Sequence, residues 1–166
     1  MIVQVTDTAP WMHFVWLTLE RIAMRSGARY PVDLELDVMV QDFKECPENH
    51  LWLVSYTADR PTGFMAVRVQ RDPMGMKIAY VTHGWQAPGA ADQTADALAL
   101  AERWARERGC IAIYTTCERT SAAAAKDGSR FRPGNVWSRI KGLLAYDRWI
   151  GKRGYVMRET RWEKIL

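Results

Sequence analysis

His83 is a candidate proton acceptor in this sequence. It lies in the segment Lys77–Trp85, which is predicted to form a β-strand. An imidazole titrates near neutral pH and can therefore act as a general base. His83 stands two residues before Trp85, so we expect the two side chains to share one face of the strand. A lone histidine on a strand also commonly has only a structural role, and both interpretations stay open.

Two further reactive side chains follow a second predicted strand. The run Cys110–Thr116 is continuously apolar, as is typical of a buried strand, and Cys117 and Glu118 come directly after it. Glu118 is the reserve candidate for a general base. A nucleophilic role for Cys117 is not favoured, because no histidine lies near it in sequence to activate the thiol.

A strand, a loop of small residues and a helix follow one another between Lys77 and Arg108. The loop Gln86–Gln93 precedes a helix predicted to begin at Thr94. The first N–H groups of a helix are unpaired and point outward, so this arrangement can hold a pyrophosphate. The loop contains one glycine and neither lysine nor arginine. The order of elements favours an anion site, and the residue types in the loop do not.

Charge is distributed unevenly along the 166 residues. The net charge is +4, and from Lys126 to Leu166 there are 11 basic residues against 4 acidic ones. This asymmetry favours an acidic protein, a nucleic acid or another anion as partner of the C-terminal third, unless it marks only a solvated basic helix. Five arginines lie near Trp137 and Trp149 in that third, and such mixtures occur at binding surfaces.

Length and composition fit one domain covering residues 1–166. We expect no membrane span and no signal peptide, because no long apolar run is present. The three cysteines form no C-x-x-C pair and are odd in number, so neither a disulfide framework nor a metal site is indicated. We therefore expect a cytoplasmic protein.

Apolar periodicity predicts an alternating α/β chain. A weak first strand at Ile2–Val5 precedes two helices, one running from Trp11 to Ile22 and a shorter one over Leu34–Lys44. Strands over 51–56, 64–70 and 77–85 are joined by short turns and should pair as an antiparallel meander. The helix from Thr94 to Arg108 should then lead to the strand at Cys110–Thr116 as a parallel crossover. A long loop over 118–135, a helix over 136–150 and a strand over 155–162 complete the chain.

This order of elements resembles the GNAT acyltransferase superfamily over nearly the whole chain. The most specific segment runs from Leu144 to Tyr155, where a helix leads into Gly154-Tyr155 and a last strand. The resemblance implies an α/β (α+β) fold, with a mixed central sheet of about six to seven strands flanked by about four helices.

The resemblance also implies a site for acetyl-CoA. Its pantetheine arm would lie along the strand from Val81 to Trp85, and its pyrophosphate would sit on the loop and the helix start. The implied loop residues are Gly89, Ala90, Ala91, Gln93, Thr94 and Ala95. Against the family pattern Q/R-x-x-G-x-G/A, Ala90 replaces the first residue and Gln93 replaces the first glycine, whereas Ala95 fits. Gln93 would then add a side chain where ligand should lie.

The family often places a tyrosine on the last helix, where it can protonate the departing thiolate. Ile150 occupies that position here, and Tyr146 one turn earlier is the substitute acid. The resemblance thus implies an N-acyltransferase in which His83 or Glu118 takes the proton of an acceptor amine on a small molecule or protein. The departures favour an alternative, a catalytically silent GNAT-fold protein of structural or assembly use, such as a phage virion component. A nucleic-acid binder is a third interpretation.

Overall fold

The computed structural model describes residues 1–26, 30–115 and 152. Contacts divide the chain into two compact units, Met1–Thr116 and Cys117–Leu166. The predicted helix over 136–150, the predicted last strand and the loop over 118–135 lie outside the described residues, and the single domain covering 1–166 stays a prediction.

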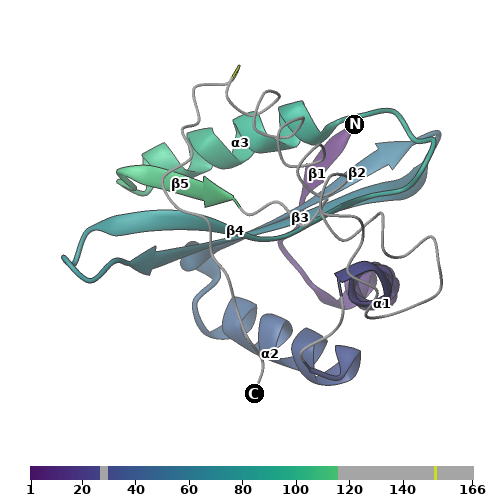
Figure 1. Ribbon diagram of the computed structural model, residues 1–166, viewed down its shortest axis with the longest axis horizontal. Helices are drawn as coiled ribbons and strands as arrows, with labels where there is room; N and C mark the ends of the chain where they lie inside the picture. The colour runs from purple at the N-terminus through teal and green to yellow at the C-terminus, as the bar shows by residue number, and fades with distance from the viewer. Residues whose placement is uncertain (27–29, 116–151, 153–166) are drawn as a thin grey trace, which may run out of the picture. The chain divides into compact units, whose positions relative to one another are not determined.

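A five-stranded sheet forms the centre of the first unit, with the strands in sequence order (Figure 1). The strands are β1 Ile2–Gln4, β2 His50–Thr57, β3 Arg60–Arg71, β4 Lys77–Gln86 and β5 Ala112–Thr115. The first four are antiparallel neighbours, whereas β5 runs parallel to β4. The antiparallel meander and the parallel crossover predicted from the sequence are both confirmed.

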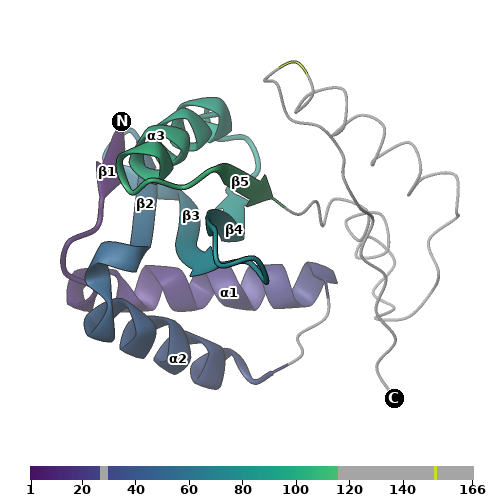
Figure 2. The ribbon, with the colours of Figure 1, turned by 90° about the vertical axis from the view of Figure 1, so that its left-hand side faces the viewer.

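Helices cover both faces of the sheet (Figures 1 and 2). Helices α1, Met12–Ser26, and α2, Val32–Glu45, lie on one face, and α3, Thr94–Glu107, lies on the other. Two short 3₁₀ helices, Ala9–Trp11 and Pro47–Asn49, precede α1 and β2. Within the described residues the fold thus has five strands and three α-helices, in the α/β arrangement that the sequence predicts.

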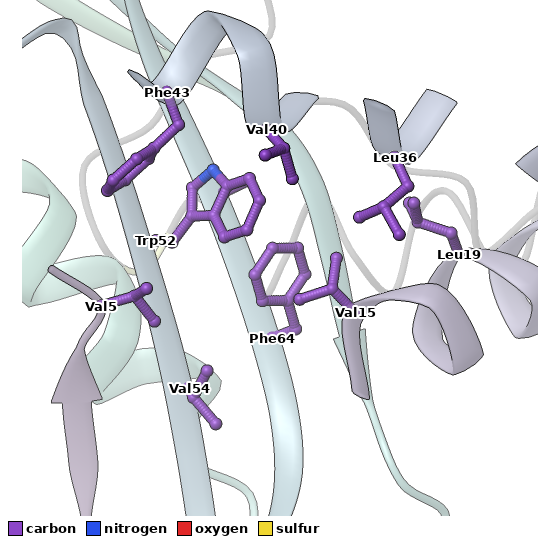
Figure 3. Packing of buried hydrophobic residues seen from close by; sticks show 10 residues of the cluster. Val5, Val15, Leu19, Leu36, Val40, Phe43, Trp52, Val54 and Phe64 are labelled. Atoms are coloured by element: carbon purple, nitrogen blue, oxygen red, sulfur yellow. The ribbon is translucent and has the colours of Figure 1, made fainter. Parts of the chain in front are cut away.

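The principal core lies between the sheet and the helices α1 and α2 (Figure 3). Trp52 is 1% exposed and its ring contacts Phe43 of α2 and Phe64 of β3, with centroids 5.2 and 5.5 Å away. Alternating residues of β2 and β3 meet apolar stripes of both helices there. The labelled members are Val5, Val15, Leu19, Leu36, Val40, Phe43, Trp52, Val54 and Phe64.

The opposite face of the sheet is covered by one apolar side of α3. Its buried residues are Ala97, Leu98, Ala101, Trp104 and Ala105. Because β2 faces helices on both sides, every residue from His50 to Ser55 is buried. Trp52 and Trp104 both belong to the core, at 1% and 5% exposed. Trp85 is also only 9% exposed.

The turn after β2 and a bulge in β4 shape this part of the sheet. A two-residue hairpin, Ala58-Asp59, joins β2 to β3, and both residues have positive φ, 47° and 60°. The pairing of β3 with β4 then shifts, because Ala66 pairs with His83 while Val67 pairs with Val81. Thr82 is thus an extra residue in β4. Such a bulge bends the strand and redirects the side chains that follow it, which here include His83.

Candidate active site

His83 forms a hydrogen-bonded pair with Glu35. The ring atom Nε2 lies 3.0 Å from Glu35 Oε1, which joins β4 to α2. Their side chains are 16% and 32% exposed. The hydrogen bond from His83 lowers the pKa of the Glu35 carboxyl, against the opposing effect of burial. Glu35 therefore stays a carboxylate under mildly acidic conditions and can hold the histidine ring in one orientation.

The other ring nitrogen of His83 faces the bulge. Nδ1 lies 3.1 Å from Thr82 Oγ1, and the same hydroxyl can donate to the Ala66 carbonyl oxygen 3.3 Å away. A hydroxyl has one proton, so it cannot donate to both groups. All three hydrogen bonds form together only when both ring nitrogens of His83 carry a proton. The surroundings of the ring are therefore suited to accommodate the proton that a general base receives.

A cavity of about 460 Å³ opens beside this pair, between α2 and the face of β2, β3 and β4. Most of its lining is apolar and includes Leu34, Val38, Met39 and Trp52. Leu34 and Val38 are about half exposed, at 51% and 52%, so the entrance is apolar as well. The cavity can accept an organic group and present it to the few polar side chains of the wall.

A second charged pair lies in the cavity wall. Arg68 donates to Asp42 Oδ2 at 2.9 Å. His50 is buried nearby, and its pKa is lowered, mainly by desolvation and then by Arg68. The neutral form of His50 is therefore favoured. Arg68 offsets the charge of Asp42, which leaves Glu35 as the carboxylate that a cationic amine would meet beside His83.

Strand β4 runs to Gln86, and its parallel neighbour β5 is described as far as Thr115. In the described residues the β4–β5 ladder ends where Val81 pairs with Thr115, while β4 continues to Gln86. Val81 is buried in the sheet. Trp85 packs its ring against Phe14, with centroids 6.3 Å apart, and Arg21 lies over the same ring. His83 and Trp85 therefore both face the α1–α2 side, as the sequence predicts.

The loop after β4 is closed by its own side chains. Gln86 donates through Nε2 to the Ala91 carbonyl oxygen and accepts from Thr94 Oγ1 at 3.0 Å. The Thr94 N–H donates to Asp92 Oδ1 at 3.0 Å. Asp96 adds a second acidic residue in the first turn of α3. Two carboxylates therefore accompany the helix start at which a bound anion was expected.

Gln93 connects the loop to the end of β2. Its side chain donates to the Tyr56 carbonyl oxygen at 2.7 Å, at the end of β2, and so ties the loop to the sheet. Gly89 has a φ of 78°, which favours glycine, and no atom lies within 4 Å of where a Cβ would be. The loop therefore has the sharp turn of an anion-binding loop but not the basic residues that would bind the anion.

Among the predicted catalytic residues, His83 is placed in the cavity wall. Tyr146 and Glu118 lie outside the described residues, as do Ile150 and the Gly154-Tyr155 ending. The sequence analysis missed Glu35, which is 48 residues from His83 and meets it only because α2 packs over β4. Its one sequence signal is a carboxylate on α2 between the apolar positions Leu34 and Leu36. No group of three possible metal ligands occurs among the described residues.

The fold is shared with solved acetyltransferases. No family model and no curated protein matches this chain. Glucosamine-6-phosphate N-acetyltransferase from Arabidopsis thaliana matches with a TM-score of 0.64 and 10% identity, over 99% of this chain and 98% of that one. A putative acetyl transferase from Pyrococcus furiosus matches with a TM-score of 0.58 and 20% identity, over the whole of both chains.

A third similar structure is a predicted acetyltransferase with acetyl-CoA from Clostridium acetobutylicum. It has a TM-score of 0.59 and 13% identity, over 80% of this chain and 90% of that one. The chain has the GNAT fold. At these identities the comparisons establish the fold alone, so the chemistry of the site has to be argued from the residues of this chain.

In the GNAT fold, the acyl donor implied by the resemblance has two parts that can be tested against the residues present. The pantetheine arm needs backbone groups on a strand edge, which the end of β4 would supply. The pyrophosphate needs N–H groups or cations at the loop. At the start of α3 the Thr94 N–H donates to the Asp92 carboxylate, and the described loop contains no lysine or arginine. The described loop residues therefore do not fit the pyrophosphate.

Proposed function

We propose that this protein is an N-acyltransferase that moves an acyl group, acetyl in the simplest case, from a thioester to an amine. The observation that supports the proposal best is the His83–Glu35 pair in the wall of the cavity under α2. It combines a group that can take up a proton with an adjoining space for an organic acceptor. The same end of β4 carries His83 and the strand edge where the thioester would lie.

His83 would act as the general base. The acceptor nitrogen forms a C–N bond to the acyl carbon while the C–S bond breaks, so the amine gives up a proton and the thiolate gains one. The lost proton goes to His83, directly or through a water molecule, and Glu35 stabilises the ring once it is charged. The acid that protonates the thiolate is Tyr146 in our sequence-based proposal, with Glu118 as the reserve base.

Acetyl-CoA is the first donor to test, because a structure with the same fold contains it. Acetyl-CoA would supply the activated acyl carbon. The backbone N–H and C=O groups from Thr82 to Gln86 would hold its pantetheine arm. The amine would enter the apolar cavity and place its nitrogen near His83 and Glu35.

The test measures acyl transfer to a panel of primary amines with apolar bodies. We expect His83→Ala to lower kcat/KM by about 100-fold or more, because a positioned general base typically contributes ~10²–10⁴. His13→Ala is the matched control, since His13 is exposed on α1, and we expect it to leave the rate unchanged. Equal rates for the wild type and His83→Ala would overturn the assignment of the base.

The structural or assembly role stays a prediction from the sequence. It requires that no thioester is turned over with any amine and that the folded chain binds an acidic protein or a nucleic acid. Turnover that depends on His83 would exclude a catalytically silent protein.

A further inference from the structure

We infer that the acceptor amine carries a carboxylate at its far end and that Arg68 binds this carboxylate. The acceptor class would then be ω-amino acids, in which a hydrocarbon chain separates the amine from the carboxylate. This inference rests on the proposed acyl transfer, because it names the substrate class of the same cavity.

The cavity is lined by two charged pairs that lie at different points along α2. In the first pair, His83 Nε2 lies 3.0 Å from Glu35 Oε1. In the second pair, Arg68 Nη1 lies 2.9 Å from Asp42 Oδ2. Glu35 and Asp42 share a face of α2, about two turns and about 10 Å apart along its axis. The two polar ends of one elongated molecule can therefore reach both pairs at once.

The sheet repeats this spacing on the other side of the cavity. Ala66 of β3 pairs with His83 of β4, and Arg68 follows Ala66 by two residues. Alternate residues of a strand share one face, so Arg68 and Ala66 both point toward α2. The two charged pairs are thus held by the same two walls, α2 and the sheet.

The surface between the two pairs is apolar. It includes Val38 and Met39, which lie between Glu35 and Asp42 on α2, and Trp52 of β2. A chain of methylene groups would remove its own surface from water against these side chains. An amine, a hydrocarbon chain and a second polar group therefore match the order of the surfaces along the cavity.

Hydrogen-bond donors are available at the Arg68 end. A guanidinium has five N–H donors in a planar fork, and in the described part of the chain Asp42 accepts from Nη1. The Arg68 side chain is 50% exposed, so its remaining N–H groups can bind a second carboxylate. His50 pairs with Arg68 across β2 and β3, and its neutral ring adds one N–H donor.

A distal ammonium group would fit this end less well. It would be attracted by Asp42 but repelled by Arg68, which already neutralises that carboxylate. Arg68 lowers the pKa of His50 more than either nearby carboxylate raises it, so the positive charge prevails at this part of the wall. Glu35 repels a carboxylate and attracts a cation at the other end. The charges therefore orient an ω-amino acid with its amine beside His83.

The experiment compares acyl transfer from acetyl-CoA to hexylamine, 6-aminohexanoate and 1,6-diaminohexane, which differ only in the far end. We expect kcat/KM for 6-aminohexanoate to exceed that for hexylamine by about tenfold or more, because a charge-assisted hydrogen bond forms in addition to the apolar contacts. 4-Aminobutyrate is too short to join the two pairs and should show no such advantage over butylamine.

Each other outcome has a definite meaning. Equal values for hexylamine and 6-aminohexanoate, or a preference for the diamine, would overturn the inference and leave the proposed function standing. No transfer to any amine, of these or of the panel described above, would overturn the proposed function itself.

Two variants of the second pair should change the preference in opposite directions. Arg68→Gln removes the positive charge, and we expect it to bring the kcat/KM ratio of 6-aminohexanoate to hexylamine close to one. Asp42→Asn removes the competing carboxylate, and we expect it to raise the ratio by about three- to tenfold. Arg60→Gln is the matched control, because Arg60 is exposed at the start of the same strand. An unchanged ratio in Arg68→Gln, with folding verified by circular dichroism, would contradict the inference.

Discussion

The His83 ring and the Glu35 carboxylate are joined at 3.0 Å although 48 residues separate them in sequence. The bond connects the strand bearing the predicted base to the helix over the cavity. It also lowers the pKa of Glu35, which keeps the carboxylate charged beside the ring. The packing of α2 on the sheet therefore forms the pair on which the proposed chemistry depends.

Replacing Glu35 by glutamine tests whether the charge of that residue supports catalysis. Glu35→Gln retains an oxygen that can accept from His83 Nε2 but no longer stabilises a charged ring. We expect kcat/KM to fall by about 10–100-fold, because the general base loses its partner. Asp37→Asn, at an exposed position on α2, should leave kcat/KM unchanged. A kcat/KM equal to that of the wild type in Glu35→Gln would contradict the role.

Removing the central tryptophan tests the core under the cavity. Trp52 is 1% exposed and lies between Phe43 and Phe64. Trp52→Ala should lower the free energy of unfolding by about 3–5 kcal/mol, because apolar contacts are lost and a cavity remains. Urea unfolding measures the change. Met24→Ala, at a side chain 65% exposed, should change it by less than about 0.5 kcal/mol.

Acidification tests the buried histidine in the cavity wall. The pKa of His50 is lowered from 6.5, chiefly by desolvation, so the unfolded chain binds its proton more readily than the folded chain does. Stability contributed by this group is therefore complete above pH 6.5 and is lost as the pH falls toward the folded-state pKa. The wild type should lose stability relative to His50→Gln over that window, at no more than ~1.4 kcal/mol per pH unit.

The measurement is urea unfolding of both proteins at several pH values between neutral and mildly acidic. His13→Gln is the control for an exposed histidine. A constant difference between the wild type and His50→Gln across the window would show that His50 does not titrate as its burial requires.

Local patterns predicted most of the described fold. The apolar runs in β2 and β3 and the helical spacing of Val15 and Leu19 are short-range patterns, which a sequence displays directly. The meander followed from the short turns, and the crossover followed from the order of a strand, a helix and a strand. By contrast, nothing local indicates that Trp85 would be buried, because its cover comes from Phe14 and Arg21 on a distant helix.

The site was predicted only in part, for the same reason. His83 could be selected by residue type and strand face. Glu35 could not, since its relation to His83 exists only once α2 packs on the sheet. The loop is a third example, because the hydrogen bond from Gln93 to the Tyr56 carbonyl oxygen joins residues 37 apart in sequence and no local pattern indicates it.

The hairpin between β2 and β3 offers a stabilising substitution. Ala58 has a φ of 47° in a two-residue turn whose second residue, Asp59, also has a positive φ. Two-residue hairpins of this kind favour asparagine or glycine, and alanine in the left-handed region costs ~1–2 kcal/mol. Glycine removes that strain but adds about 0.4–1 kcal/mol of unfolded-state entropy. We therefore expect Ala58→Gly to raise the free energy of unfolding by about 0.5–1 kcal/mol.

The reverse change at Gly89 is the matched comparison. Gly89 has a φ of 78° and open space around the position of a Cβ, so Gly89→Ala meets backbone strain without a steric clash. We expect it to lower the free energy of unfolding by about 1 kcal/mol. Chemical denaturation of the two variants beside the wild type measures both signs at once. Destabilisation by Ala58→Gly would show that the turn is not strained, because the remaining effect of glycine is entropic and unfavourable.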